Sequence, residues 1–146
     1  MFNINHQVGI KANPESVYHA LTTNEGLATW WTHDTSGADG VGSTIEFRFG
    51  GGGPDFTVVE LIPNTLVKWQ HSGDMPDAWM GTTITFELRE QDDQTFVRFT
   101  HASWKEQSNF MAHCSTKWAV FLVSLKEALE TGTGRAFPND IHIDHS

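Results

Sequence analysis

At 146 residues, the chain has the length of one domain, which is enough to bury a sizeable core. An aromatic content of 12% and a charged content of 18% exclude an intrinsically disordered chain, which has few aromatic residues and many charges. The 18 acidic and 9 basic residues give a formal charge of −9, which repels phosphate backbones and excludes nucleic acid as a partner.

Other features of the sequence indicate in which cellular compartment the protein lies. The longest apolar run, residues 119–123, is far too short to span a bilayer, and no basic amphipathic stretch favours stable membrane anchoring. The first residues lack the basic and apolar regions of a secretion signal. The single cysteine, Cys114, excludes an internal disulfide and is typical of a reducing compartment. We therefore expect a cytoplasmic protein.

The N-terminal part of the chain predicts a strand followed by two short helices. Apolar and polar residues alternate over residues 2–10, which is typical of a strand with one buried face. Asn13 and Pro14 then form a helix start, with Asn13 as N-cap and Pro14 in the first helical position. This helix is expected to end near residues 22–24, and a second short helix is expected through residues 27–31.

The middle of the chain predicts a run of strands. Residues 37–42 are rich in Gly, Asp and Ser and indicate a loop. Five further segments alternate apolar with polar residues and are separated by turn residues: 45–49, 56–62, 67–71, 84–88 and 97–101. Short strands joined by brief turns predict an antiparallel meander, here of about six strands with the first one included.

The C-terminal part changes to a helical period. Apolar residues recur at a spacing of three and four over about five turns: Met111, Cys114, Trp118, Phe121, Leu122, Leu125 and Leu129. Gly132 and Gly134 are stop signals for this helix. The sequence thus predicts an α+β protein with a single domain over residues 1–134 and a C-terminal tail over residues 135–146.

Three segments of the chain resemble a known family. They are residues 14–22 (PESVYHALT) running on to 27–31 (LATWW), residues 81–88 (GTTITFEL), and Trp118 followed by Leu122 and residues 125–132 (LKEALETG). In this order and spacing they resemble the SRPBCC (START-like) superfamily, specifically the family related to the C-terminal domain of the Aha-type activator of the heat-shock chaperone ATPase. The resemblance implies a helix-grip fold, in which a curved antiparallel sheet wraps around the long C-terminal helix.

The same resemblance implies a cavity between sheet and long helix, but a shared fold does not settle one activity. Relatives include lipid carriers, hormone receptors and polyketide cyclases. The leading hypothesis is a binding protein for a small hydrophobic or aromatic molecule. One alternative is a cyclase- or hydrolase-like enzyme that uses a pocket histidine. Another is a regulator of a chaperone ATPase, acting in a stress response through contact with the chaperone.

Candidate ligand-binding residues are those expected to face the space between sheet and helix, together with Trp79 in the loop over residues 73–79. They are Phe47, Phe49, Trp69, His71, Trp79, Phe86, Phe99, His101, Trp118, Phe121 and Leu122. Their rings either line a ligand-sized cavity or fill the space as a packed core. The loop that carries Trp79 is a pocket lip, a partner-contact surface or an ordinary strand connection.

Three histidines, His6, His71 and His101, have the inward phase of their strands. Because a buried polar group without a partner costs about 1–3 kcal/mol, each needs a hydrogen bond. The histidines are bonded to backbone or lie at a solvated rim, or they contact a ligand, or they bind a metal. No short-range pair of ligands supports the metal interpretation, so neither a metal nor a cofactor is expected.

Three further features have competing explanations. His142, Asp144 and His145 offer metal ligands, but tail residues are usually mobile, so a designed metal site is not expected. The glycines of residues 50–53 lack the Lys-Ser/Thr of a phosphate loop and favour a hairpin tip that acts as a flap. Cys114 has the buried phase of the helix, which favours a core thiol over a nucleophile. The sequence is compatible with a homodimer and leaves the ligand and any reaction open.

Overall fold

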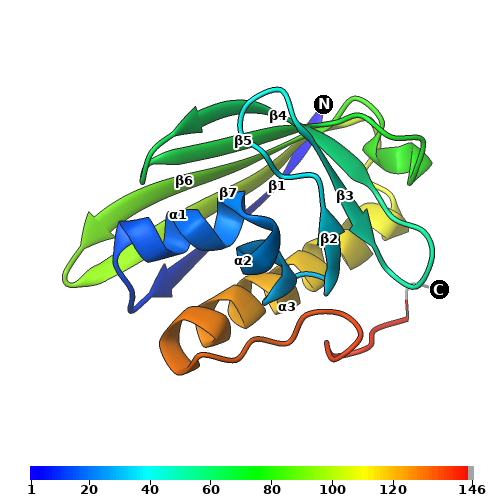
Figure 1. The fold of residues 1–146 in the computed structure, drawn as a ribbon. Helices are drawn as coiled ribbons and strands as arrows, with labels where there is room; N and C mark the ends of the chain where they lie inside the picture. Colours follow the sequence, from blue (N-terminus) through cyan, green and yellow to red (C-terminus); the bar gives the residue numbers. More distant parts are fainter. Residues whose placement is uncertain (145–146) are drawn as a thin grey trace.

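The computed structural model describes residues 1–144, and its elements follow the expected order. They are β1 (Phe2–Ile10), α1 (Pro14–Thr22), α2 (Asn24–Ala28), β2 (Asp34–Ser36), β3 (Thr44–Arg48), β4 (Asp55–Ile62), β5 (Leu66–His71), the 3₁₀ turn η1 (Asp77–Trp79), β6 (Thr83–Gln91), β7 (Gln94–Trp104) and α3 (Asn109–Thr131). Figure 1 shows the three helices on one side of a curved sheet, with α3 running along its concave face.

The strands of residues 1–144 form a single antiparallel sheet. Its seven strands lie in the order β1-β7-β6-β5-β4-β3-β2, so the first strand pairs with the last one. A register shift between Val58 and Glu60 marks a bulge in β4. Bulges of this kind bend a sheet and increase its twist, which brings it around the helix. The predicted α+β helix-grip fold is confirmed.

Capping residues explain where the helices begin and end. The Asn13 side chain accepts a hydrogen bond from the backbone N–H of Ser16 at 2.8 Å, as predicted for an N-cap. Ser108 caps α3 in the same way, with 3.1 Å between its hydroxyl and the N–H of Met111. Gly132 ends α3 with φ of 89°, a left-handed conformation that glycine adopts without steric cost.

Two details differ from the sequence prediction. The sheet has one strand more than expected, because β2 pairs with β3 although its three residues, Asp34–Ser36, show no apolar alternation. The second helix ends at Ala28, so its prediction through residue 31 was wrong. Trp30 and Trp31 lie in the turn that follows, and the Trp30 indole N–H donates to the Ala20 carbonyl at 2.9 Å. This bond orients the ring into the core without a helix.

The core lies between the concave face of the sheet and α3. Most strand residues predicted to face inward are buried and meet the apolar stripe of α3, whereas Phe49 is half-buried and Phe2 is exposed. The buried strand positions include Ile45, Phe47, Phe56, Val58, Val67, Trp69, Ile84, Phe86, Val97 and Phe99, and those of α3 include Met111, Cys114, Trp118, Phe121, Leu122 and Leu125. Alternate burial along each strand follows from the period of two in side-chain direction.

Residues beyond α3 fold back along the helix and are called the C-terminal strap, residues 135–143. The backbone N–H of Arg135 donates to the Ser124 hydroxyl at 2.7 Å, and Ala136 is 1% exposed. Phe137 pairs with the segment before β2, donating to the Trp31 carbonyl at 2.9 Å and accepting from the N–H of His33 at 3.2 Å. Figure 1 shows the strap beside α3, below β2 and β3.

Candidate functional site

A cavity of about 640 Å³ opens between the first turns of α3, the loops at one end of the sheet and the C-terminal strap. Its lining residues are Trp31, Phe49, Gly52, Gly53, Pro54, Met75, Pro76, Trp79, Phe110, His113, Cys114, Lys117, Trp118, Phe121, Phe137, Asp140, His142 and Ile143. This volume lies within the range of roughly 300–1,000 Å³ that small-molecule sites occupy. The cavity is therefore large enough for a small organic ligand.

Seven of the eighteen residues that line the cavity are Trp or Phe. Among them, the Trp118 ring centroid lies 4.9 Å from that of Trp31 and 6.0 Å from that of a nearly parallel Trp79. Phe137 of the strap meets Phe49 edge-on, with centroids 5.5 Å apart. Flat apolar walls with stacked rings suit planar or chain-like apolar molecules, because such ligands gain both area burial and ring contacts.

The cavity separates the predicted ligand-binding residues into two groups. Phe49, Trp79, Trp118 and Phe121 line it directly. The remaining seven lie behind this wall in the packed core, away from the lining: Phe47, Trp69, His71, Phe86, Phe99, His101 and Leu122. Three of the four lining residues, Trp79, Trp118 and Phe121, are also buried in the core, so they both pack against it and border the cavity.

His101 is fully buried and has a hydrogen bond on each ring nitrogen. The indole N–H of Trp118 donates to Nδ1 at 3.1 Å, so Nδ1 carries no proton. Nε2 therefore carries the proton and donates to the Thr82 hydroxyl at 2.9 Å, which in turn donates to the Trp79 carbonyl at 2.6 Å. This chain fixes a neutral imidazole and ties α3 to the loop that carries Trp79.

The pKa of His101 agrees with this role. Burial, and secondarily the nearby charge of His71, lower its pKa from 6.5 to about 3. Desolvation disfavours the charged form of a buried histidine, and both nitrogens are already used. His101 thus acts as a structural hydrogen-bonding residue at neutral pH.

His71 and His6 also have partners within the protein. Nε2 of His71 lies 2.8 Å from the carbonyl oxygen of Met75, and this bond holds the loop between β5 and β6 against the sheet. Nε2 of His6 lies 3.0 Å from the backbone oxygen of Ser115 and thereby joins β1 to α3. Of the three interpretations of these histidines, the contacts support hydrogen bonding within the protein.

Cys114 borders the cavity but has the chemistry of a core thiol. Burial raises its pKa to about 11, although the Trp79 indole N–H, which favours the thiolate, opposes this effect. Because the thiolate is the reactive form, this environment keeps the sulfur inert near neutral pH. The Trp79 N–H itself is buried without a nitrogen or oxygen acceptor.

Polar groups gather where α3 meets the strap. The Lys117 ammonium lies 2.5 Å from a carboxylate oxygen of Asp140 and donates to the Ile141 carbonyl at 2.8 Å. It also lies 4.8 Å from the centre of the Phe121 ring, a cation–π contact. An ammonium has three N–H donors, and two of them have oxygen partners among the described residues.

Sequence reasoning missed several of these lining residues. Trp31 and Phe137 follow irregular backbone, where no period indicates which way a side chain points. Lys117 and Asp140 are 23 residues apart, so their pairing depends on how the strap returns along α3. The paired aromatic residues Trp30 and Trp31 were a usable signal, because two adjacent indoles in a turn need burial.

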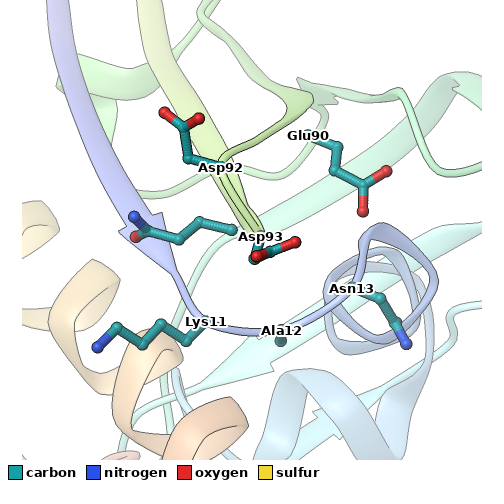
Figure 2. Close-up of a pocket in the computed structure, with 7 residues that line it drawn as sticks. Lys11, Ala12, Asn13, Glu90, Asp92 and Asp93 are labelled. Carbon is teal, nitrogen blue, oxygen red and sulfur yellow. The ribbon is translucent and has the colours of Figure 1, made fainter.

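A second hollow, of about 370 Å³, lies at the opposite end of the sheet. It is lined by Lys11, Ala12, Asn13, Glu90, Asp92, Asp93 and Gln94, from the β6–β7 hairpin and the segment after β1. Figure 2 shows that the carboxylates of Glu90, Asp92 and Asp93 do not converge on one point. This hollow is therefore a less suitable site for an apolar ligand than the aromatic cavity.

The described part of the chain has neither a metal-binding cluster nor a helix able to cross a membrane. Within residues 1–144, no group of three or more His, Cys, Asp or Glu residues is placed to hold a metal ion. His142 and Asp144 are exposed and hydrogen-bonded, with 2.7 Å between Nε2 and a carboxylate oxygen, whereas His145 lies outside the described residues. In the same part of the chain, no helix combines the length and apolar character needed to cross a membrane.

The curved sheet, the helix it wraps and the cavity between them define a START-like (SRPBCC) helix-grip protein. Residues 11–130 match the family described as Activator of Hsp90 ATPase homolog 1-like protein, and the chain belongs to this family. Among curated proteins, none matches the chain.

Solved structures agree with this assignment. The Aha1 dimer from Colwellia psychrerythraea, a solution structure, is 66% identical with a TM-score of 0.86 and matches 92% of this chain and 100% of that one. SSP2350 from Staphylococcus saprophyticus is 20% identical, with a TM-score of 0.75 over 91% of this chain and 95% of that one. DynU16, from the dynemicin biosynthetic locus, is 21% identical, with a TM-score of 0.77 over 90% of this chain and 48% of that one. The last two support the fold alone.

Proposed function

We propose that the protein binds a small apolar or aromatic molecule in the cavity between α3, the sheet end and the C-terminal strap. The observation that carries this proposal is the aromatic wall around about 640 Å³ of space, with Trp31, Trp79 and Trp118 on it. A concavity lined mainly by apolar and aromatic side chains is typical of a small-molecule site.

We assign the direct ligand contacts to Phe49, Trp79, Trp118 and Phe121. His71 and His101 have a supporting role in this proposal, because their hydrogen bonds hold the loop that carries Trp79. The third donor of Lys117 is suited to a hydrogen-bond acceptor on the ligand. Since Asp140 already neutralises Lys117, a neutral acceptor such as a carbonyl or hydroxyl oxygen fits better than a second carboxylate.

The test is a titration with the neutral probe N-phenyl-1-naphthylamine, whose emission rises in apolar surroundings. We expect binding with quenching of tryptophan emission, because three indoles border the cavity. Phe49→Ala should weaken binding roughly 5- to 30-fold, the loss of about 1–2 kcal/mol of apolar contact.

Phe96→Ala is the matched control, since Phe96 is also half-buried but contacts Arg89 outside the cavity. It should leave probe affinity unchanged. Equal loss in both variants, or no probe binding by the wild type, would contradict the proposed site.

A cyclase- or hydrolase-like activity is the alternative on the same cavity. The neutral, doubly bonded His101 and the protonated Cys114 argue against either as acid, base or nucleophile. Chaperone-ATPase regulation, the role in the family's name, would instead need an exposed surface that contacts the chaperone. Product formation from a bound ligand would favour the enzyme, and co-purification with a chaperone would favour the regulator.

We also propose that the protein is a cytoplasmic homodimer. The dimer proposal is supported by the Colwellia protein, which is 66% identical and is described as a dimer. The cytoplasmic proposal is supported by the lone Cys114, a buried free thiol of the kind that reducing compartments preserve.

A further inference from the structure

The strand β1 is a long edge of the sheet. It has nine residues and pairs with β7 on one side, whereas β2, at the other edge, has three residues. An edge strand presents a row of backbone donors and acceptors that another strand can pair with, so proteins shorten, charge or cover such edges. The length of β1 raises the question of what covers it.

Two side chains of α3 bind backbone groups at one end of this edge, and these bonds show which groups face away from β7. The Lys126 ammonium donates to the Gly9 carbonyl at 2.6 Å, and the N–H of Lys11 donates to the Glu130 carboxylate at 2.8 Å. These backbone groups therefore point away from β7. Since alternate residues of an antiparallel strand direct both backbone groups to the same side, those of Asn5 and Gln7 also point to the open edge.

The uncovered stretch of the edge, residues 3–7, has no charge to repel a second strand. Residues 1–10 contain no Asp, Glu, Lys or Arg side chain, in a chain with a formal charge of −9. Asn3, Asn5 and Gln7 are all exposed, and each carries a carboxamide with donors and an acceptor. Asn3 and Asn5 use their oxygens toward β7, accepting from Ser103 and Thr100, which leaves their N–H donors.

We propose that β1 pairs antiparallel with β1 of a second copy around a twofold axis near Asn5, so that the two sheets become one. This inference rests on the homodimer proposed above and names its interface. The strand is self-complementary about that axis, because Asn3 then lies opposite the partner's Gln7 and Asn5 opposite its own copy. Such symmetry is the requirement for a closed isologous dimer. The absence of charge lets two strongly acidic chains approach here.

The test measures the dimer constant by sedimentation velocity for the wild type and Asn5 variants. Asn5→Pro removes the outward N–H, and proline is tolerated on an edge strand where that N–H faces solvent. We expect it to weaken the dimer at least tenfold while the circular dichroism of the fold is retained. Asn5→Ala keeps the N–H and is the matched control, expected to dimerise within about threefold of the wild type.

Asn5→Asp provides an independent variant that does not alter the backbone. It places two carboxylates across the axis, so the dimer should weaken at low salt and recover in part at high salt, where exposed charges are screened. Gln70→Asp adds the same charge on β5, away from the edge, and should have little effect. A wild-type dimer that persists in both Asn5→Pro and Asn5→Asp overturns the β1 interface and leaves the homodimer standing. A monomeric wild type overturns the homodimer itself.

Discussion

The imidazole of His101 connects three parts of the molecule that are distant in sequence. Its partners, Trp118 and Thr82, lie 17 and 19 residues away along the chain. The alternation of β7 predicts that this side chain faces inward, and it does. The pattern gives no information on the partners, because these depend on how α3 lies across the sheet. An inward histidine in a sequence is therefore equally compatible with a ligand contact and with an internal bond.

The lowered pKa of His101 makes stability depend on pH. Its folded pKa of about 3 lies below the ordinary 6.5, so between these values the unfolded chain binds the extra proton. Its contribution to stability is therefore fully present above about pH 6.5 and decreases as the pH falls, by up to about 1.4 kcal/mol per pH unit. Urea unfolding at pH 7 and at about pH 4.5 measures this loss.

In His101→Gln this part of the pH dependence should disappear, while stability at pH 7 falls by about 1–3 kcal/mol because the flexible amide does not keep both ring bonds, to Trp118 and to Thr82, in place. His19 is exposed on α1, so His19→Gln is the control and should follow the wild type. If His101→Gln keeps the full wild-type dependence on pH, the buried neutral imidazole is not its source.

At the scale of elements, the sequence predicts the sheet strands and α3 well because each carries a regular period of buried residues. It does not predict β2, since Asp34–Ser36 are polar and form a strand only by pairing with β3. Nor does it predict the strap as a wall of the site. Phe137 is placed by backbone hydrogen bonds with the segment before β2, and backbone pairing between irregular segments leaves no side-chain pattern.

Lys117 of α3 contacts the end of the strap through Asp140 and the Ile141 carbonyl. Lys117→Gln removes the ion pair with Asp140, so the amides of residues 139–143 should exchange with deuterium roughly fivefold faster, because local opening becomes easier. Hydrogen exchange read by mass spectrometry resolves this segment. Lys105→Gln, at an exposed lysine just before α3, should leave exchange unchanged. Unaltered exchange in Lys117→Gln would show that other contacts hold the strap.

At the scale of the whole molecule, core and cavity divide the space between sheet and helix. Rings such as Trp69, Phe86 and Phe99 fill it where β5, β6 and β7 pass over the middle of α3. The cavity lies toward the start of α3, where loops and strap replace strands as walls. The sequence predicts the aromatic residues that face both regions, but the boundary between core and cavity depends on the curvature of the sheet.

Removal of the strap separates the two regions experimentally. A chain of residues 1–134 keeps every strand and α3, so it should unfold cooperatively, with a loss of about 1–3 kcal/mol from the contacts of Ala136 and Phe137. Its affinity for N-phenyl-1-naphthylamine should fall at least tenfold, because Phe137, Asp140 and Ile143 no longer wall the cavity.

A chain that ends at Asp144 is the control and should bind like the full chain. Urea unfolding and probe titration on the same samples measure both effects. Non-cooperative unfolding of residues 1–134 would show that the domain extends beyond residue 134, whereas full affinity in a folded truncated chain would place the ligand away from the strap.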